Sequence, residues 1–565
     1  MSVTTIHFPK LGHFWLDSGL VGLESMLRIV DTPAEINVNE AGISLTGEAN
    51  EIERILYEAY DALVKQYYNV STKKQRDDTS SWNFYYNLEN DVFEAFPKRK
   101  SVGIASLIFD KAARKTGSQV KWKSKPQQFE ITIGEKVIKR KRATLPNSHS
   151  YLQERLDTFL DKNDLNAGPD GGLLVDGPNA VKPKMKIKVD SKATKGVCYL
   201  CGEPSNLLEE ASQTTFPLLT GSSGVLSFNP GAGAPEKVCW KCSLRGKFVP
   251  VNGFYLKQGD CLFAFFPFST SLQKMIDSHV FLQDALYEHP NYFRNFQHPL
   301  GSEKNPVGFF QRPFEVSFAF LYTIYNKLLK YGAGTEDSEN VLDIARMCDL
   351  TLSKAPLEFV VLEAQSKGQT AMTKMVWPFR DTVYFFRLLD QLERGGVNIK
   401  EVMHLYINFQ QPKFENKTII RNRICERILK KQSILDLTET HVFRADVNYV
   451  KPLLDFLVVY EQLVQKEGSM TEEEQQAAVQ LGKRLGMAVG HGGKKGDLFR
   501  LRKARKQTDF LNEINRLQFK FNLAVPPDVY DGKLTEENFT VFKQFCMIAA
   551  LNSFNAATST RGGEK

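Results

Sequence analysis

Several features that mark membrane, secreted or disulfide-linked proteins are missing from this sequence. Its most apolar runs, such as Cys261 to Phe268, are far shorter than the roughly 20 residues that a membrane-spanning helix needs. The segment Met1 to Lys10 has no basic start followed by an apolar stretch, so we expect no signal peptide. Eight cysteines among 565 residues are too few for a disulfide framework. We therefore expect a soluble, cytoplasmic protein that does not bind membranes.

Motifs of common active sites are missing as well. The sequence contains no Gly-x-x-x-x-Gly-Lys-Ser/Thr phosphate loop, no Gly-x-Ser-x-Gly elbow and no His-Glu-x-x-His pair. The nine histidines are scattered, and His289 and His298 each precede a proline, which indicates turns. No carboxylate pair stands out among 65 acidic residues. We expect a protein that is not an enzyme, although a nuclease built from distant carboxylates stays open.

The most informative motif is a pair of Cys-x-x-Cys knuckles, Cys198 to Cys201 and Cys239 to Cys242. Each knuckle places two thiolates at the spacing that binds one side of a tetrahedral zinc ion. Together they predict a closed shell of four thiolates, and hence a structural Zn²⁺ rather than a catalytic one. Four free thiols or a redox pair are the alternatives. We interpret the other four cysteines as core thiols; they are Cys261, Cys348, Cys425 and Cys546.

The pattern of apolar residues predicts an α+β fold. In the N-terminal part we expect a helix over 13–30 capped by Asp17 or Ser18, a strand over 40–49, a helix over 51–68 and a hairpin over 128–139. From about residue 310 helical periods dominate, over 314–330, 339–352, 378–393 and 417–431. The last segment predicts four helices, over 448–466, 471–488, 497–521 and 535–553.

Signals for helix starts and helix ends help to divide the chain into four parts. Thr471 and Glu474 form a capping-box signature, and Gly490 is interpreted as a helix end. We predict an N-terminal α+β domain over 1–190, a four-cysteine zinc-binding insertion over 191–260, a mostly helical continuation of the body over 261–446 and a C-terminal four-helix bundle over 447–565.

Positive charge is grouped although the net charge is only +8. The first cluster comprises Lys121, Lys123, Lys125, Lys139, Arg140, Lys141 and Arg142. A second group alternates along a strand-like segment and comprises Lys182, Lys184, Lys186 and Lys188. The third comprises Lys483, Arg484, Lys494, Lys495, Arg500, Arg502, Lys503, Arg505 and Lys506. Any one cluster is compatible with a solvated face, but three clusters favour nucleic-acid binding through phosphate contacts.

Aromatic side chains interleaved with amides occur twice, over 82–87 and 291–296. Such rings can stack on bases, although rings of this kind more often belong to a core.

Three of these features together resemble one family. The double Cys-x-x-Cys segment, the opening run from Trp15 through Asp17, Ser18 and Gly19 to Leu20, and the basic helical C-terminus are similar to the large subunit of type I CRISPR–Cas Cascade complexes. Within that family the chain most resembles the CXXC–CXXC proteins of subtype I-B.

The resemblance implies a non-catalytic subunit of an RNA-guided prokaryotic complex. It implies PAM recognition in target double-stranded DNA, help with R-loop formation, and recruitment of a helicase-nuclease or a transposition effector. The implied partners are crRNA, both forms of the target (the duplex and the displaced single strand), and the backbone, 5′-end and small subunits. Residues 448–565 would line the R-loop, with the third basic cluster on phosphates. We expect segments 83–90 and 121–125 at the groove edge, and Met403 or Met470 as internal starts of a separate small subunit.

Two other hypotheses remain open from the residues alone. One is a stand-alone zinc-dependent nucleic-acid enzyme, which robust turnover by the isolated chain would favour. The other is a protein-interaction scaffold, which strongly salt-dependent nucleic-acid binding would exclude.

Overall fold

The computed structural model divides by internal contacts into two compact units. Unit 1 comprises Met1–Phe296 and Ser353–Arg380, and unit 2 comprises Gln297–Leu352 and Asp381–Lys565. The structure describes residues 3–63, 77, 83–87, 92–96, 119–123, 128–133, 136–140, 186–189, 194–211, 237–286, 295–296, 298–300, 310–332, 358–367, 370–445, 447, 450–464 and 470–562. The segment 261–446, expected as one helical continuation, is shared between the two units.

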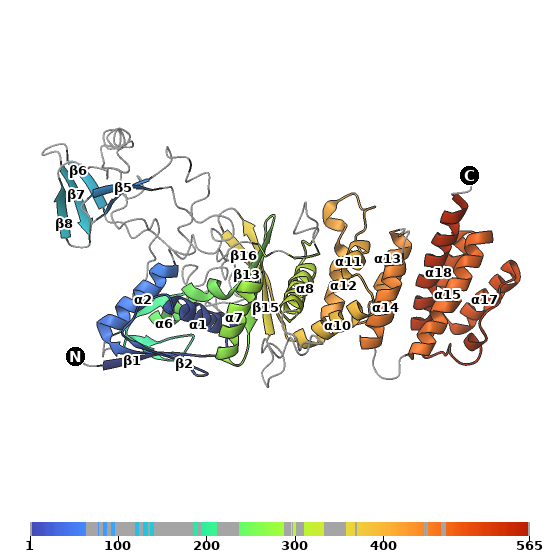
Figure 1. Cartoon of the computed structure of the whole chain (residues 1–565), viewed down its shortest axis with the longest axis horizontal. Coiled ribbons are helices and arrows are strands. Elements are labelled where there is room, and N and C mark those ends of the chain that lie inside the picture. The colour runs from blue at the N-terminus through green and yellow to red at the C-terminus, as the bar shows by residue number, and fades with distance from the viewer. Residues whose placement is uncertain are drawn as a thin grey trace. The chain divides into compact units, whose positions relative to one another are not determined.

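Unit 1 begins with a three-stranded antiparallel sheet and two helices (Figure 1). The strands are β1 (Val3–Pro9), β2 (Glu35–Asn39) and β3 (Gly42–Glu48), in the order β1-β3-β2. The helices are α1 (Phe14–Leu27) and α2 (Ala49–Leu63). The predicted strand over 40–49 and the helix over 13–30 are thereby confirmed, the helix with shorter bounds. The helix predicted over 51–68 is confirmed up to Leu63, and its remaining residues lie outside the described ones.

The predicted cap of α1 is wrong. His13 occupies the N-cap position without a side-chain hydrogen bond. Asp17 lies inside the first turn, where its carboxylate accepts hydrogen bonds from Leu11 N at 2.9 Å and Lys10 Nζ at 3.3 Å. Asp17 and Ser18 are both completely buried. Sequence pattern alone places a polar residue near a helix start, but only packing decides whether it caps the helix or fixes the loop before it.

Helix α6 (Trp240–Phe248) packs closely against α1, and two glycines of α1 make that contact possible. A Cβ on Gly19 would lie 2.4 Å from the carbonyl oxygen of Arg245, and one on Gly22 would lie 2.1 Å from that of Phe248. No side chain fits at such distances. The Asp-Ser-Gly run of the sequence therefore has a structural role: it joins the N-terminal helix to the cysteine-bearing helix.

Unit 1 also contains a four-stranded antiparallel sheet. Its strands are β13 (Phe254–Gln258), β14 (Cys261–Phe268), β15 (Glu358–Lys367) and β16 (Thr370–Phe379), paired in chain order. Helix α7 (Leu272–Leu286) contacts β14. The pair β15–β16 differs from the expectation that helical periods dominate after residue 310. Phe359 to Leu362 form a short apolar run, which periodicity alone does not assign to a strand or a helix.

Two smaller sheets of unit 1 are described by their backbone. Strands β4 (Asn83–Asn87) and β5 (Val92–Phe96) pair with each other, and β7 (Gln128–Ile133) lies between β6 (Gln119–Lys123) and β8 (Lys136–Arg140). The β7–β8 pairing confirms the hairpin predicted over 128–139.

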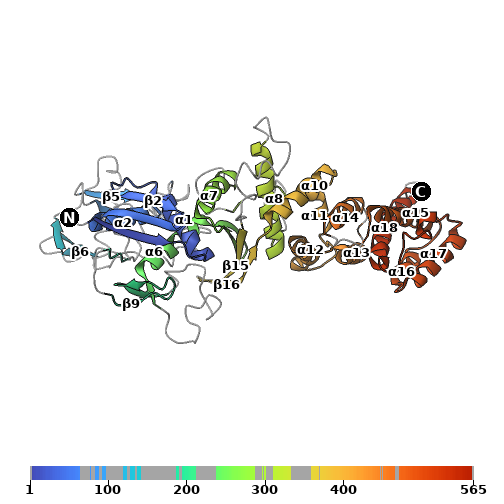
Figure 2. The ribbon, with the colours of Figure 1, turned by 90° about the horizontal axis from the view of Figure 1, so that it is seen from below.

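The regular elements described in unit 2 are all helices (Figure 2). Its α-helices are α8 (Pro313–Gly332), α10 (Thr382–Arg394), α11 (Ile399–Leu405), α12 (Ile419–Leu429), α13 (Leu435–Arg444), α14 (Lys451–Val464), α15 (Glu472–Gly492), α16 (Lys495–Lys503), α17 (Gln507–Phe521) and α18 (Phe539–Gly562). The predicted helix over 339–352 lies outside the described residues. The antiparallel sheets of unit 1 and these helices confirm the α+β class.

The C-terminal helices depart from prediction at two places. The helix predicted over 497–521 is two helices, interrupted at Ala504, Arg505 and Lys506. Gly490 does not end α15 but lies inside it, where an added Cβ would be 2.6 Å from Ala557 Cβ. The capping box of Thr471 and Glu474 is confirmed, with both reciprocal hydrogen bonds present.

Candidate metal centre

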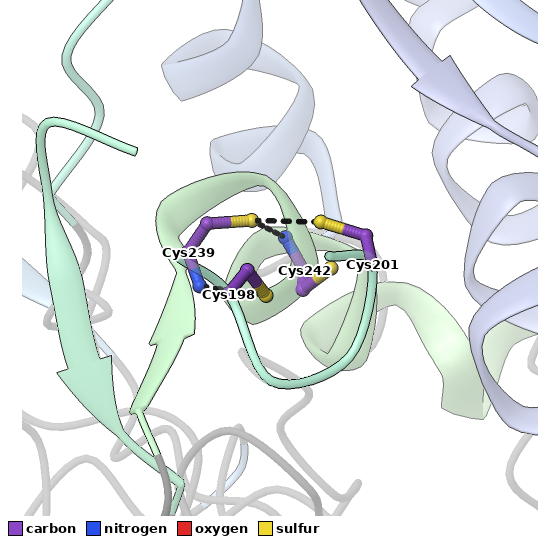
Figure 3. A group of neighbouring side chains, drawn as sticks. All are labelled: Cys198, Cys201, Cys239 and Cys242. Carbon is purple, nitrogen blue, oxygen red and sulfur yellow. Dashed lines mark hydrogen bonds between the residues drawn. The ribbon is translucent and has the colours of Figure 1, made fainter. Parts of the chain in front are cut away.

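Two short pairs of strands bring the four cysteines together (Figure 3). Cys198 and Cys201 lie in the turn between β9 (Gly196–Val197) and β10 (Pro204–Ser205). Cys239 ends β12 (Lys237–Cys239), which pairs with β11 (Leu208–Glu210), and Cys242 lies in the first turn of α6. The two predicted knuckles therefore meet from opposite sides, one from a hairpin and one from a helix start.

The sulfur atoms have the separation that a tetrahedral ion requires. All four Sγ atoms lie within 4.8 Å of one another, and the Sγ atoms of Cys201 and Cys239 are 3.8 Å apart. A zinc ion with Zn–S bonds of about 2.3 Å sets neighbouring sulfurs about 3.8 Å apart in a regular tetrahedron. Cys198, Cys239 and Cys242 are each only 1% exposed. The donor set and its geometry thus fit a four-thiolate metal site.

Backbone groups hold the sulfurs in place. The amide of Cys239 donates to Cys198 Sγ at 3.2 Å, and the amide of Cys242 donates to Cys239 Sγ at 3.4 Å. In the second bond Cys239 acts as the N-cap of α6 through its sulfur. Gly202 adopts a φ of +71°, which a residue with a side chain rarely takes, and so lets the first knuckle turn back. Such amide donors stabilise thiolates and orient them toward a metal.

Hydrogen bonds shared among the thiols act on them unequally. They lower the pKa of Cys198 and raise the pKa of Cys239 and Cys242, so the thiols do not all become thiolates through these bonds alone. Helix α6 adds two buried cations, Arg245 (0% exposed) and Lys247 (1% exposed). Burial lowers the pKa of Lys247 to about 8, against the opposing attraction of Glu209. Buried positive charge of this kind is compatible with a metal–thiolate group, which carries two negative charges when four thiolates bind a divalent ion.

The site is built into the core of unit 1. Trp240, between the two cysteines of the second knuckle, packs edge-on against Phe8 of β1 with ring centroids 6.1 Å apart. Lys241 donates to the carbonyl oxygen of His7 at 3.2 Å and forms an ion pair with Glu203. A metal bound here would cross-link the β9–β10 hairpin to the start of α6, which itself contacts β1 through Trp240 and Lys241. Four protein ligands would leave the metal no open position for a substrate.

The first two basic clusters are only partly described. Lys121 and Lys123 lie on β6, and Lys139 and Arg140 on β8; Lys121 and Lys139 are both register partners of Glu130 in β7. Of the alternating lysines, Lys186 and Lys188 are both exposed, and Ile187 between them is buried. The other residues of these clusters lie outside the described residues: Lys125, Lys141, Arg142, Lys182 and Lys184.

The third basic cluster lies on α15, α16 and their connections. Exposed members whose side chains have no hydrogen bond or ion pair among the described residues are Lys483, Lys494, Arg500, Lys503, Arg505 and Lys506. Three other members lie in different surroundings. Arg484 donates to the carbonyl oxygen of Ala524 at 3.3 Å, Lys495 is partly buried, and Arg502 forms an ion pair with Glu439 at 2.9 Å.

Some charged groups important for packing were not identified from the sequence. Arg421 and Glu315 form a buried ion pair at 2.9 Å between α12 and α8. Glu461 of α14 is completely buried and accepts a hydrogen bond from Ile434 N at 2.8 Å. Burial raises the pKa of Glu461 to about 7. No motif marks these residues, because their environment is produced by helices far apart in the chain.

The remaining predicted features have mixed outcomes. Phe296 is a buried ring packed against Phe265. This agrees with the interpretation that rings of the aromatic segments belong to a core. His298 is also buried, while His289 and Cys348 lie outside the described residues. Cys425 and Cys546 are buried, and Cys261 is partly buried. Among the described helices, none combines the length and the hydropathy needed to traverse a lipid bilayer.

Comparison with models of protein families gave no match, and no similar sequence was found among curated proteins. The cysteine centre and the charged surface of unit 2 are the features of the chain that indicate a function.

Proposed function

We propose that this chain is a non-catalytic nucleic-acid-binding protein whose unit 1 is braced by a structural zinc ion. In the form that the resemblance implies, it is the large subunit of a Cascade-like complex, which surveys PAM-containing DNA, supports the R-loop and recruits the downstream effector. The observation that carries the proposal is the set of exposed cations on α15, α16 and the start of α17 that have no acidic partner within the described part of the chain.

The acidic residues nearest in the sequence do not neutralise these cations. Asp497, the one acid of α16, is 7% exposed and binds two other residues, Arg516 at 3.1 Å and Lys520 at 2.7 Å. Arg502 is likewise engaged by Glu439, and its guanidinium lies 4.8 Å from the ring centre of Phe443. On α16 and in the break after it, charge pairing among the described residues therefore leaves four exposed cations free, namely Arg500, Lys503, Arg505 and Lys506.

The spacing of these free cations suits a phosphate chain. Arg500 and Lys503 are three residues apart on α16 and so lie on one side of the helix. Arg505 and Lys506 follow at once in the break before α17. A polyanionic strand gains affinity from such a surface by releasing its counterions, with little need for base contacts. This supports a role in holding a strand rather than in reading its sequence.

The test is salt-dependent binding by the full chain. Kd for a fluorescent single strand and a duplex would be measured from about 50 to 300 mM salt. Replacing Arg500, Lys503, Arg505 and Lys506 by Ala should weaken binding to every sequence. The slope of log K against log salt should become shallower by about three if all four residues contact phosphates. Arg502 is kept, because its contacts with Glu439 and Phe443 make it part of the packing.

A matched control removes the same charge elsewhere in unit 2. Arg387, Lys400, Lys413 and Arg423 are also two arginines and two lysines, exposed and without a partner among the described residues. Their replacement by Ala should leave the salt slope nearly unchanged. Equal losses in both quadruple variants would mean that only net charge matters, and no binding by the wild type at low salt would end the proposal. Turnover of DNA or RNA by the isolated chain would favour the zinc-dependent enzyme instead.

An internal start at Met470 is compatible with the helix boundaries. Met470 directly precedes Thr471, the N-cap of α15. A product beginning there would contain α15 to α18, whereas one beginning at Met403 would start inside α11. Mass spectrometry of the native complex would detect either product, and its absence would remove the separate small subunit from the proposal.

A further inference from the structure

Arg245 is a buried cation whose surroundings do not fully neutralise it. It lies on α6, three residues after the metal ligand candidate Cys242, and is completely buried. None of its three guanidinium nitrogens has a hydrogen-bond partner among the described residues. Its nearest carboxylate oxygen, Asp17 Oδ1 of α1, lies 3.5 Å from Nη2. Burying a guanidinium in this way is unfavourable unless further negative charge lies close by.

Asp17 cannot supply that charge alone, because its carboxylate also binds residues of the corner between β1 and α1. Its carboxylate accepts the Leu11 amide and binds Lys10 Nζ, which is itself 8% exposed. One buried carboxylate is therefore shared by two cations. Among the described residues, the other negative charge near Arg245 comes from the cysteine centre, because Cys242 lies three residues before Arg245 and on the same side of α6.

We infer that Arg245 is the counter-charge of the metal-loaded cysteine centre, and that its link to Asp17 couples metal binding to the β1–α1 corner. A divalent ion held by four thiolates carries two negative charges in a site from which water is largely excluded. The guanidinium stabilises that charge without touching the metal, so Arg245 is a positioning residue and not a ligand. The inference depends on the metal centre and is independent of nucleic-acid binding.

Replacing Arg245 and replacing Asp17 should change the metal affinity in opposite directions. Replacing Arg245 by Met removes the counter-charge and should weaken metal binding, by about 10- to 100-fold for an outer partner of a metal site. Replacing Asp17 by Asn removes the competing carboxylate and leaves Arg245 to the thiolates, so metal binding should become several-fold tighter. Arg245→Lys keeps the charge and should fall between the wild type and Arg245→Met.

The experiment measures Zn²⁺ affinity of the full chain by competition with a chelating dye, and Co²⁺ binding by the thiolate-to-cobalt absorption band. The double variant Asp17→Asn with Arg245→Met should remain as weak as Arg245→Met. Arg421→Met serves as the control, because it breaks a buried arginine–glutamate pair in unit 2 without altering the cysteine centre.

Each outcome decides for or against the inference. If Arg245 only stabilised the fold, both single variants would weaken metal binding in proportion to their loss of stability, and the double variant would recover it. That pattern, or wild-type affinity in Arg245→Met, would overturn the inference. Failure of the wild type to bind either metal would remove the centre itself, while leaving the nucleic-acid test unaffected.

Discussion

The contact between α15 and α18 depends on glycine, and this permits a sharp test of the packing. Helices α15 and α18 lie side by side (Figures 1 and 2). Three glycines of α15 spaced four apart, Gly482, Gly486 and Gly490, face α18. A Cβ on Gly486 would lie 2.1 Å from the carbonyl oxygen of Ala550 and 2.9 Å from its Cα. Both neighbours are backbone atoms of a helix, so no side-chain rotation relieves the clash.

The magnitude for Gly486→Ala follows from two opposing effects. Alanine favours the helix by about 1 kcal/mol relative to glycine. The helices must, however, separate until the 2.1 Å contact reaches at least 3.0 Å, which loosens contacts along the whole interface. Overpacking of this kind costs about 3 kcal/mol at the upper end of its usual range. We expect the free energy of unfolding of unit 2 to fall by about 2 kcal/mol.

Gly496 provides a control with the same substitution. It lies in the first turn of α16, and an added Cβ would meet no atom within 4 Å. Gly496→Ala should therefore raise the free energy of unfolding by about 0.5–1 kcal/mol. The two variants differ only in whether the new methyl group has room, so opposite signs would isolate the effect of close packing.

The tryptophans allow the two units to be followed separately. All five, Trp15, Trp82, Trp122, Trp240 and Trp377, belong to unit 1. In urea titrations, tryptophan fluorescence therefore reports on unit 1, and far-UV circular dichroism reports mainly on the helices of unit 2. Gly486→Ala should lower the dichroism midpoint and leave the fluorescence midpoint unchanged. Equal shifts for both alanine variants, or no shift for Gly486→Ala, would refute the packing argument.

Two further predictions concern the metal centre and the buried acid of unit 2. Cys198→Ser combined with Cys201→Ser should abolish zinc binding and shift the Trp240 emission to longer wavelength while the unit 2 helices stay folded; one retained equivalent of zinc would show that the ligands are misassigned. Glu461 has its pKa raised from 4.5 to about 7 by burial, so folded unit 2 keeps a proton that the unfolded chain has lost. Its free energy of unfolding should therefore fall by up to about 3 kcal/mol from pH 4.5 to 7. Glu461→Gln should remove most of this decrease in urea titrations by circular dichroism, and an unchanged pH dependence would contradict it.

The sequence predicted correctly those features that depend only on residues close together in the chain. The two Cys-x-x-Cys spacings, the capping box at Thr471 and the hairpin over 128–139 each need only a few adjacent residues, and the structure confirms their geometry. The break at Ala504 was missed because the apolar pattern continues across it from Leu501 to Phe510, both of which are buried. The role of Gly490 was missed because a helix end and a close helix contact both favour glycine.

The sequence by itself determined the α+β class, most helices and the four thiols at zinc-binding spacing, since periodicity and ligand spacing are properties of short segments. Only the tertiary structure decided which charges are free. Arg502 and Arg500 look equivalent in the chain, yet one faces Glu439 of α13 and the other faces solvent. Likewise Asp17 resembles a helix cap in the sequence, but lies buried between Lys10 and Arg245. The physical reason is that the energy of a charge depends on burial and on partners distant in sequence, and folding alone brings these together.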